Sequence, residues 1–260
     1  FGVEVTFVKG TDTQELEGAM RENTDLIYLE SPSTYLFLVQ DLKQISEIAK
    51  RYHAATVIDN TYCTPVFQKP LTMGIDMVVH SASKYLGGHS DIIGGVVVGR
   101  SEDISQVAQN ERELFGAVMS PFDSWLMLRG MRTLPVRMKQ HMSNALDMAA
   151  YFQKLSIVKE VIYPWWETHP QYELAKKQMT GASGLMSVVF DLPGEQIKKI
   201  VNELEFFHRG PSWGGFESLI SPVGADLAQD NDTMKKGLVR MHIGLEGADL
   251  LMEDFERAVK

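Results

Sequence analysis

Asp76-Met-Val-Val-His-Ser-Ala-Ser-Lys-Tyr-Leu-Gly-Gly-His-Ser-Asp91 is the stretch of this chain that decides its fold. Its apolar run, residues 77–79, predicts a buried strand, which is followed by Lys84 between small hydroxyl residues and glycines. A second apolar run, residues 55–58, ends in the carboxylate of Asp59. Apolar strands that alternate with helices are typical of a mostly parallel sheet covered on both faces. Because ligands of such sheets bind beyond the carboxyl ends of the strands, we expect Lys84 and Asp59 to share one binding edge.

Further strand and helix patterns extend on both sides of this stretch. Strands are expected over residues 3–8, 25–30, 93–99, 184–191 and 238–244. A mainly helical region is expected over residues 101–157 and a loop over 161–169, with individual helices over 41–50, 141–155, 195–207 and 248–259. We therefore predict an α/β protein with a mostly parallel sheet flanked by helices and a smaller C-terminal α/β domain. The large domain is expected over residues 1–145 and the small domain over residues 146–260.

The composition sets the broad class of the protein. With 44% hydrophobic and 23% charged residues, the chain has an ordinary globular composition. Its net charge of -9 argues against a nucleic-acid surface, and no apolar run approaches the roughly 20 residues of a membrane helix. The single cysteine, Cys63, fits a reducing cytoplasm and a buried structural thiol, and the histidines show no metal-ligand spacing. Since the chain opens inside a strand pattern and without a methionine, we expect it to be the C-terminal part of a longer protein.

Lys84 and Asp59 together indicate a site for pyridoxal phosphate. In such a site a lysine forms a Schiff base with the cofactor and an acid keeps the pyridine nitrogen protonated. The hydroxyls of Ser81 and Ser83 could both donate to a dianionic phosphate. The alternatives are ordinary ones: a solvated surface lysine, an Asx turn at Asp59 and serines of a plain loop. The position of Lys84 directly after an apolar strand favours the cofactor site.

A rival interpretation rests on the same residues. Ser81-Ala-Ser-Lys84 matches the S-x-x-K motif of serine acyl-enzymes such as penicillin-binding proteins. Those enzymes also need S-D-N and K-T-G, whereas Ser90-Asp91 is followed by Ile92 and K-T-G is absent. The motif also opens a helix in those enzymes, while here it closes a predicted strand. The acyl-enzyme remains the weaker hypothesis.

Two segments far along the chain are candidates for binding a substrate. Arg240 stands inside the apolar run 238–244, where a buried guanidinium needs an anionic partner. That partner is either an internal carboxylate or the carboxylate of a substrate, which arginine can bind in a bidentate way. The segment 210–219 is rich in glycine and holds Ser212 and Trp213, and by itself it predicts only a loop.

At these motifs the chain resembles the Cys/Met-metabolism family of fold-type I pyridoxal phosphate enzymes, over essentially all 260 residues. As a set, the matching segments are highly specific. They are Glu30-Ser-Pro32, Val57-Ile-Asp-Asn-Thr61, His80-Ser-Ala-Ser-Lys-Tyr85 with Gly88-His-Ser-Asp91, Trp125-Leu-Met-Leu-Arg-Gly130, Ser212-Trp-Gly-Gly-Phe-Glu-Ser218 and Val239-Arg-Met-His-Ile-Gly-Leu-Glu246.

The resemblance implies roles for the candidate residues. It makes Lys84 the Schiff-base lysine, Asp59 the partner of the pyridine nitrogen, and Ser81 and Ser83 the phosphate ligands. It also implies three substrate-binding residues: Arg240 as the α-carboxylate clamp, Ser212 as the residue that orients the lysine, and Trp213 as part of the pocket wall.

This chain departs from the family pattern in two places. Many members carry an asparagine near the ring hydroxyl of the cofactor, and Thr34 stands at that position here. The family also has an N-terminal segment with further cofactor ligands that is not in the sequence given. A catalytically silent fragment or assembly subunit is therefore one hypothesis for this chain.

The resemblance also implies an activity. The sequence around Trp213 is closest to the branch of bacterial β-lyases that cleave cystathionine. We therefore expect a carbon–sulfur lyase of methionine biosynthesis and transsulfuration that releases homocysteine, pyruvate and ammonia by β-elimination. γ-Elimination or γ-replacement on a sulfur amino acid is the nearest alternative. A cytoplasmic homotetramer built from dimers is the expected assembly, without a nucleic-acid or membrane partner and without a metal.

Overall fold

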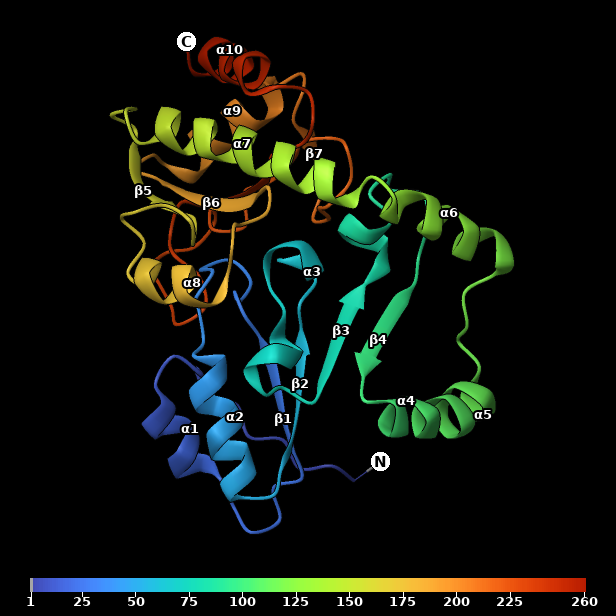
Figure 1. Cartoon of the computed structure of the whole chain (residues 1–260). Coiled ribbons are helices and arrows are strands. Elements are labelled where there is room, and N and C mark those ends of the chain that lie inside the picture. The colour runs from blue at the N-terminus through green and yellow to red at the C-terminus, as the bar shows by residue number, and fades with distance from the viewer. Residues whose placement is uncertain (1) are drawn as a thin grey trace.

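The computed structural model describes residues 2–260 and contains two sheets (Figure 1). The first sheet has the strand order β1 (Leu26–Glu30), β2 (Ala55–Asp59), β3 (Met77–Ser81) and β4 (Gly95–Gly99). The first three strands are parallel and β4 is antiparallel to β3. The register places Glu30 beside Asp59, so the carboxyl ends of these strands meet at one edge.

Helices that begin at acidic caps cover this first sheet. In α2 (Leu42–Arg51) the carboxylate of Asp41 accepts the backbone N–H of Gln44 at 3.0 Å, which satisfies a free donor of the first turn. In α1 (Thr13–Ala19) the residue before the helix, Asp12, has the same function. The apolar face of α2 is buried against the sheet in a small core cluster that includes Leu42, Ile45 and Ile48 of α2. The short segments α3 (Thr64–Phe67) and a 3₁₀ turn at Pro70–Met73 connect β2 to β3.

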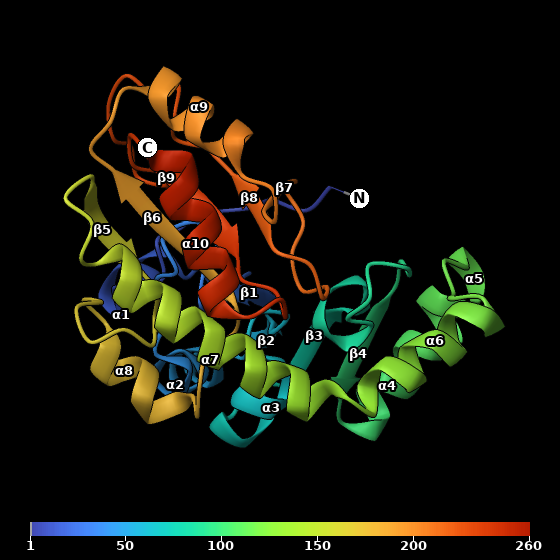
Figure 2. The ribbon, with the colours of Figure 1, turned by 90° about the horizontal axis from the view of Figure 1, so that it is seen from above.

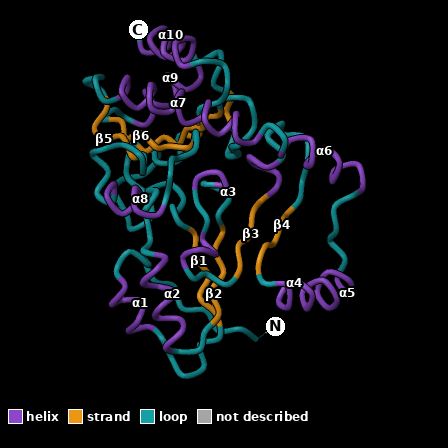
Figure 3. Tube along the Cα trace, in the orientation of Figure 1, coloured by secondary structure: helices purple, strands orange, loops and turns teal. Residues whose placement is uncertain are grey.

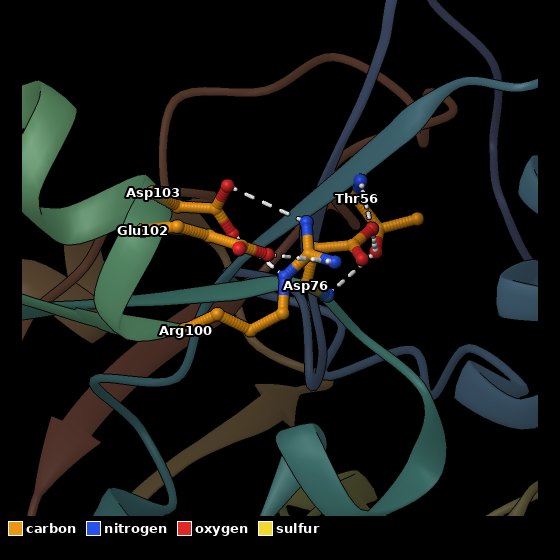
Figure 4. Close-up of polar contacts among 5 residues, drawn as sticks. All are labelled: Thr56, Asp76, Arg100, Glu102 and Asp103. Carbon is orange, nitrogen blue, oxygen red and sulfur yellow. Dashed lines mark hydrogen bonds and ion pairs between the residues drawn. The ribbon is translucent and has the colours of Figure 1, made fainter.

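The edge of the first sheet opposite to the strand carboxyl ends is tied by polar contacts (Figure 4). Asp76 Oδ2 accepts from the N–H and the hydroxyl of Thr56, at 2.9 and 2.8 Å, which links the starts of β2 and β3. Arg100 pairs with Asp103 at 2.8 Å where β4 leads into α4 (Ser101–Val107). The contact between Asp76 and Thr56 therefore joins β2 and β3 at the end away from the predicted site.

Helices connect the first sheet to the second. After α4 the chain forms α5 (Glu113–Phe115), α6 (Pro121–Met131) and the long α7 (Leu134–Phe152), which runs from the first sheet across the second one (Figure 2). The hydroxyl of Ser120 accepts the N–H of Asp123 at 3.0 Å and Pro121 follows it, a typical helix start. No helix among residues 2–260 is both long and apolar enough to cross a membrane.

The second sheet has the strand order β5 (Val158–Ile162), β6 (Leu185–Phe190), β9 (Leu238–His242), β8 (Leu219–Ser221) and β7 (His208–Arg209). Its pairs are antiparallel except β7 with β8. Together with α7, the helices α9 (Gly194–Glu203) and α10 (Ala248–Val259) lie on one face, and α8 (Tyr172–Gln178) lies on the other side (Figures 1 and 2). Every residue of the central strands β6 and β9 is buried, so this sheet forms the main core.

Most predicted elements are present (Figure 3), but one prediction is wrong and two are wrong in part. Residues 3–8 form no strand, because Val3 and Phe7 are 77% and 91% exposed and no strand in the described part of the chain pairs with them. The predicted loop 161–169 begins within β5, and the helix predicted at 141–155 starts earlier, at Leu134. The predicted domain boundary at residue 145 lies inside α7, which is continuous there, so the boundary remains a prediction.

Candidate active site

A cavity of about 180 Å³ opens at the carboxyl edge of the first sheet. Four of the residues predicted from the sequence line it: Asp59, Ser81, Lys84 and Trp213. Thr34, at the position where many relatives carry asparagine, also lines it. The structure therefore brings together residues that are more than 150 positions apart in the chain, from Asp59 to Trp213.

Lys84 lies in a short helical turn, Ala82–Leu86, that follows β3. Its own backbone is not helical, with φ −91° and ψ −131°, so the turn is interrupted at the lysine. The side chain donates from Nζ to the hydroxyl of Ser212 at 2.6 Å, and Nζ is 5.5 Å from the ring centre of Trp213. Burial, and next the charge of Arg240, lower the pKa of Lys84 below its ordinary value. A lowered pKa increases the fraction of neutral amine, which is the nucleophilic form.

Asp59 is held by the residue two positions after it. Asp59 Oδ1 accepts from the backbone N–H of Thr61 at 2.8 Å and from its hydroxyl at 2.5 Å. The hydroxyl oxygen of Thr61 in turn accepts the N–H of Ser81 at 2.8 Å, which ties the ends of β2 and β3 together. Both hydrogen bonds use Oδ1, so Oδ2 has no partner within residues 2–260 and remains free for a ligand.

The two serines differ in position. Ser81 lines the cavity, whereas Ser83 is not among the lining residues and its hydroxyl oxygen accepts the N–H of Gly94 at 3.1 Å. A hydroxyl that accepts can still donate its own hydrogen, so this contact leaves Ser83 able to bind an anion. Its role as a phosphate ligand remains a prediction.

Arg240 lies in the central strand β9 and is only 8% exposed. It makes no ion pair with any carboxylate among residues 2–260, which excludes the internal salt bridge considered from the sequence. The guanidinium donates to the carbonyl of Pro211 and stacks over the ring of Tyr35 at 5.2 Å. Burial lowers the pKa of Arg240, opposed by the nearby Tyr35 and Glu30. A buried cation without an ion-pair partner is suited to bind the anionic group of a ligand.

The loop of residues 210–218, called here the Trp213 loop, lies directly against the lysine segment. Gly214 has φ +87°, and a Cβ atom built on it would be 2.9 Å from Lys84 Cα. Only glycine combines this backbone conformation with such a close approach. The glycine therefore allows Ser212 and Trp213 to reach the lysine.

Two residues of the site were not predicted from the sequence. Thr61 connects Asp59 to β3, as described, and its spacing of two residues after an aspartate is the signal of an Asx turn. Arg137 of α7 donates to the carbonyls of Tyr85 and Gly130 at 2.9 and 2.8 Å, and so it connects the segment that carries Lys84 to the end of α6. An arginine among the buried residues of a helix, here beside Leu134 and Met138, was the available signal.

The residues present fit pyridoxal phosphate. The site offers an amine with a lowered pKa, a carboxylate with a free oxygen, a lining serine hydroxyl and a buried guanidinium without an ion-pair partner. These groups match an aldehyde, a ring nitrogen that becomes cationic, a phosphate and a substrate carboxylate. In the part of the chain that the structure describes, no cluster of three or more His, Cys, Asp or Glu could hold a metal ion.

Known proteins with similar sequences and structures place the chain in one family of pyridoxal phosphate enzymes. The model of the family described as Cys/Met metabolism PLP-dependent enzyme matches residues 1–260. A cystathionine beta-lyase of Lactococcus lactis subsp. cremoris (strain MG1363) is 38% identical over 268 residues, which cover 100% of this chain and 70% of that protein. An L-methionine gamma-lyase of Porphyromonas gingivalis (strain ATCC BAA-308 / W83) is 41% identical over 271 residues, covering 100% of this chain and 67% of that protein. The crystal structure of metB from Corynebacterium glutamicum superposes with a TM-score of 0.92 at 33% identity, over 98% of this chain and 67% of that one.

Proposed function

Because the chain belongs to the Cys/Met metabolism PLP-dependent enzyme family, we propose that it cleaves cystathionine by β-elimination and releases homocysteine, pyruvate and ammonia. The observation that carries the proposal is one cavity lined by both Lys84 and Asp59, in which the amine of Lys84 lies 5.5 Å from the ring centre of Trp213 and Asp59 has a free oxygen. The form of the Trp213 loop, as judged from the sequence, favours the β-lyase branch. A relative named cystathionine beta-lyase over the whole chain supports the same choice.

Four residues would hold the cofactor. Lys84 would attach to its aldehyde, Asp59 would pair with the ring nitrogen, and Ser81 and Ser83 would donate to the phosphate. When bound, pyridoxal phosphate supplies an electron sink that stabilises negative charge at the substrate α-carbon.

Residues of the chain would bind the substrate, move its α-proton and position the lysine. Arg240 binds and orients the α-carboxylate of the substrate through its free guanidinium nitrogens. The substrate's own amine would take the place of Lys84 on the aldehyde, and the freed amine of Lys84 would then take the α-proton on Nζ. Burial lowers the pKa of Lys84, which increases the fraction of the neutral amine that can act as a base. Ser212 accepts a hydrogen bond from Nζ and thereby orients the lysine, while Trp213 forms part of the cavity wall and limits the access of water.

The keto acid product tests the proposed reaction. Purified protein with added pyridoxal phosphate is incubated with cystathionine, and the products are identified by mass spectrometry. β-Elimination gives pyruvate and homocysteine, whereas γ-elimination gives 2-oxobutyrate and cysteine. The matched control is Lys84→Ala, which should abolish product formation. Normal turnover in that variant would contradict the assignment of Lys84. If 2-oxobutyrate is the main product of the parent protein, the reaction is γ-elimination and the proposed β-elimination is wrong.

γ-Elimination is the second candidate, and one specific observation supports it. The relative named L-methionine gamma-lyase is 41% identical over the whole chain, slightly more than the β-lyase relative. Methionine is therefore the second substrate to assay, and 2-oxobutyrate with methanethiol is the product expected from it.

A homotetramer is the assembly that we propose, in the cytoplasm. An apolar surface supports self-association: α5, α6 and the loop between them expose a group of large side chains, which are Leu114, Phe115, Val118, Phe122, Trp125 and Leu128. Patches of this kind on a soluble protein usually mark an interface. Light scattering coupled to size-exclusion chromatography measures the assembly, and a Trp125→Glu variant should dissociate it because a charge would be buried in the interface.

A further inference from the structure

His242 connects the two segments that form the lysine site. It is the last residue of β9, two positions after Arg240, and it is almost completely buried. Its Nε2 lies 3.1 Å from the carbonyl oxygen of Gly215 in the Trp213 loop. Its Nδ1 lies 3.4 Å from the hydroxyl of Tyr85, the residue directly after Lys84.

The partners of His242 determine which nitrogen carries the hydrogen. A carbonyl oxygen can only accept, so Nε2 must be the donor toward Gly215. In the neutral ring Nδ1 is then the acceptor, and the hydroxyl of Tyr85 donates to it. The oxygen of Tyr85 also accepts the N–H of Gly184 at 3.0 Å, which fixes the direction of the hydroxyl.

The ring stays neutral under ordinary conditions. Burial, together with the charges of Lys84 and Arg240, lowers the pKa of His242 to about 4, although the hydrogen bond to Gly215 acts in the opposite direction. His141, 5.0 Å away between ring centres, also has its pKa lowered by burial, to about 3. The hydrogen-bond directions given above therefore hold near neutral pH.

These contacts act on the geometry of the lysine. Gly215 is three residues after Ser212, which accepts from Lys84, and two residues after Trp213, whose ring packs on Tyr85 at 5.6 Å. The loop has other anchors nearer its ends: Arg240 holds the carbonyl of Pro211, and the hydroxyl of Ser90 donates to Glu217 at 2.6 Å. His242 holds the middle of the loop, where it passes against the lysine backbone.

We propose that His242 is a positioning residue of this site: its Nε2–H bond to the Gly215 carbonyl holds Ser212 and Trp213 against Lys84 and keeps water from the amine. Tyr85 supports this function by fixing the tautomer of the ring. The inference rests on the proposed function only in taking Lys84 as the reactive amine, and it does not depend on which substrate is cleaved.

Two substitutions at His242 separate its two hydrogen bonds. The side-chain amide of asparagine reaches the place of Nδ1, so His242→Asn keeps an acceptor for Tyr85 and loses the donor to Gly215. The longer glutamine places its amide near Nε2, so His242→Gln keeps the donor to Gly215 and loses the acceptor for Tyr85. Both replacements remove a neutral ring, so neither changes the charge around Lys84.

The readout is the pKa of Lys84, measured without substrate or turnover. The full chain without added pyridoxal phosphate is labelled with a trace of acetic anhydride over a range of pH, and the acetylation of Lys84 is followed by mass spectrometry. Water that enters a loosened site relieves the desolvation that lowers the pKa of Lys84. We expect the midpoint to rise by about one pH unit in His242→Asn and to stay near the parent value in His242→Gln.

Tyr85 and Tyr163 give a matched pair of further variants. Both are completely buried, and the hydroxyl of Tyr163 donates to the carbonyl of Ser183 at 2.9 Å. Tyr163 has no hydrogen bond to the Trp213 loop within the described range 2–260. Tyr85→Phe should therefore shift the Lys84 midpoint upward by a smaller amount, because His242 loses its fixed tautomer. Tyr163→Phe should lower stability to a similar degree and leave the midpoint unchanged.

Specific results would overturn the inference. One is a parent-like midpoint in His242→Asn, and another is an equal shift in His242→Asn and His242→Gln. If His242→Asn does not fold, an unchanged midpoint in Tyr85→Phe, or an equal shift in Tyr163→Phe, would overturn it as well. Because no cofactor, substrate or product enters the measurement, a wrong assignment of the reaction would leave these results unaffected.

Discussion

Replacement of Arg240 is the perturbation whose effect can be derived most directly from the structure. The guanidinium is buried in the central strand of the second sheet and has no carboxylate partner among residues 2–260. One of its terminal nitrogens donates to the carbonyl of Pro211, which leaves other N–H groups to bind the substrate carboxylate. Arg240→Ala should therefore remove substrate contacts while leaving the proposed cofactor ligands Lys84 and Asp59 in place.

The expected size of the loss follows from two charge-assisted hydrogen bonds. Each is worth roughly 1.5–3 kcal/mol, so the pair contributes roughly 3–6 kcal/mol. With a tenfold change for about 1.4 kcal/mol, kcat/KM should fall by about 10²- to 10⁴-fold in Arg240→Ala. Arg240→Lys keeps the charge but loses the bidentate geometry, so a loss of about tenfold is expected.

Two measurements on the same variants test this reasoning. Steady-state kinetics with cystathionine give kcat/KM from pyruvate formation, and absorption titration gives the affinity for pyridoxal phosphate. Ser81→Ala is the matched control, because it should weaken cofactor binding more than substrate binding. The reasoning would be refuted if Arg240→Ala lost less than about tenfold in kcat/KM, or if it lost cofactor affinity to the same extent.

Three further predictions concern the cofactor, the pH dependence of stability and the thiol. Asp59→Asn should retain the cofactor but turn over roughly 10- to 100-fold more slowly in a steady-state assay, because a charge-assisted hydrogen bond worth roughly 1.5–3 kcal/mol is lost; an unchanged rate would contradict the pairing. Burial lowers the pKa of His242 to about 4 and of His141 to about 3 from the ordinary value of 6.5, so below pH 6.5 the unfolded chain binds more protons than the folded one. The free energy of unfolding, measured in urea, should be at its maximum above pH 7 and should fall by about 2 kcal/mol for each histidine between pH 7 and pH 5. A free energy of unfolding that does not change with pH in this range would be evidence against this. Cys63 is completely buried and burial raises the pKa of its thiol, so a thiol reagent should modify it far more slowly in the folded protein than in urea; equal rates would mean that the thiol is accessible.

The first sheet and its two candidate residues were predictable because their signals are local. Apolar runs that end in Asp59 and Ser81 predicted parallel strands with polar carboxyl ends, and β2 and β3 confirm this. Residues 3–8 gave a different signal, the alternation of apolar and polar side chains, and they form no strand. An alternating pattern describes one segment by itself. A strand also needs a neighbouring strand with which its backbone groups form hydrogen bonds, and the pattern does not show whether such a neighbour exists.

On the substrate side of the site, Arg240 stood out within an apolar run, whereas Ser212 and Trp213 were predictable only through resemblance. Ser212 lies 128 residues after Lys84, and no local pattern connects a glycine-rich loop to a distant lysine. The contact depends on the path of α7 and on the pairing of β9 with β6, which bring the second sheet to the carboxyl edge of the first. The contact of His242 with Tyr85 was not predictable for the same reason, because the two residues are 157 positions apart. A histidine in an apolar strand predicts burial but not the partner.

The central claim is that Lys84 carries pyridoxal phosphate, and one measurement tests it directly. The absorption spectrum of the purified protein with added pyridoxal phosphate is recorded before and after borohydride, and peptides are then mapped by mass spectrometry. The account predicts a visible band that borohydride abolishes and a pyridoxyl group on Lys84, which is absent in Lys84→Ala. A band without modification at Lys84, or no band at all, would contradict the account.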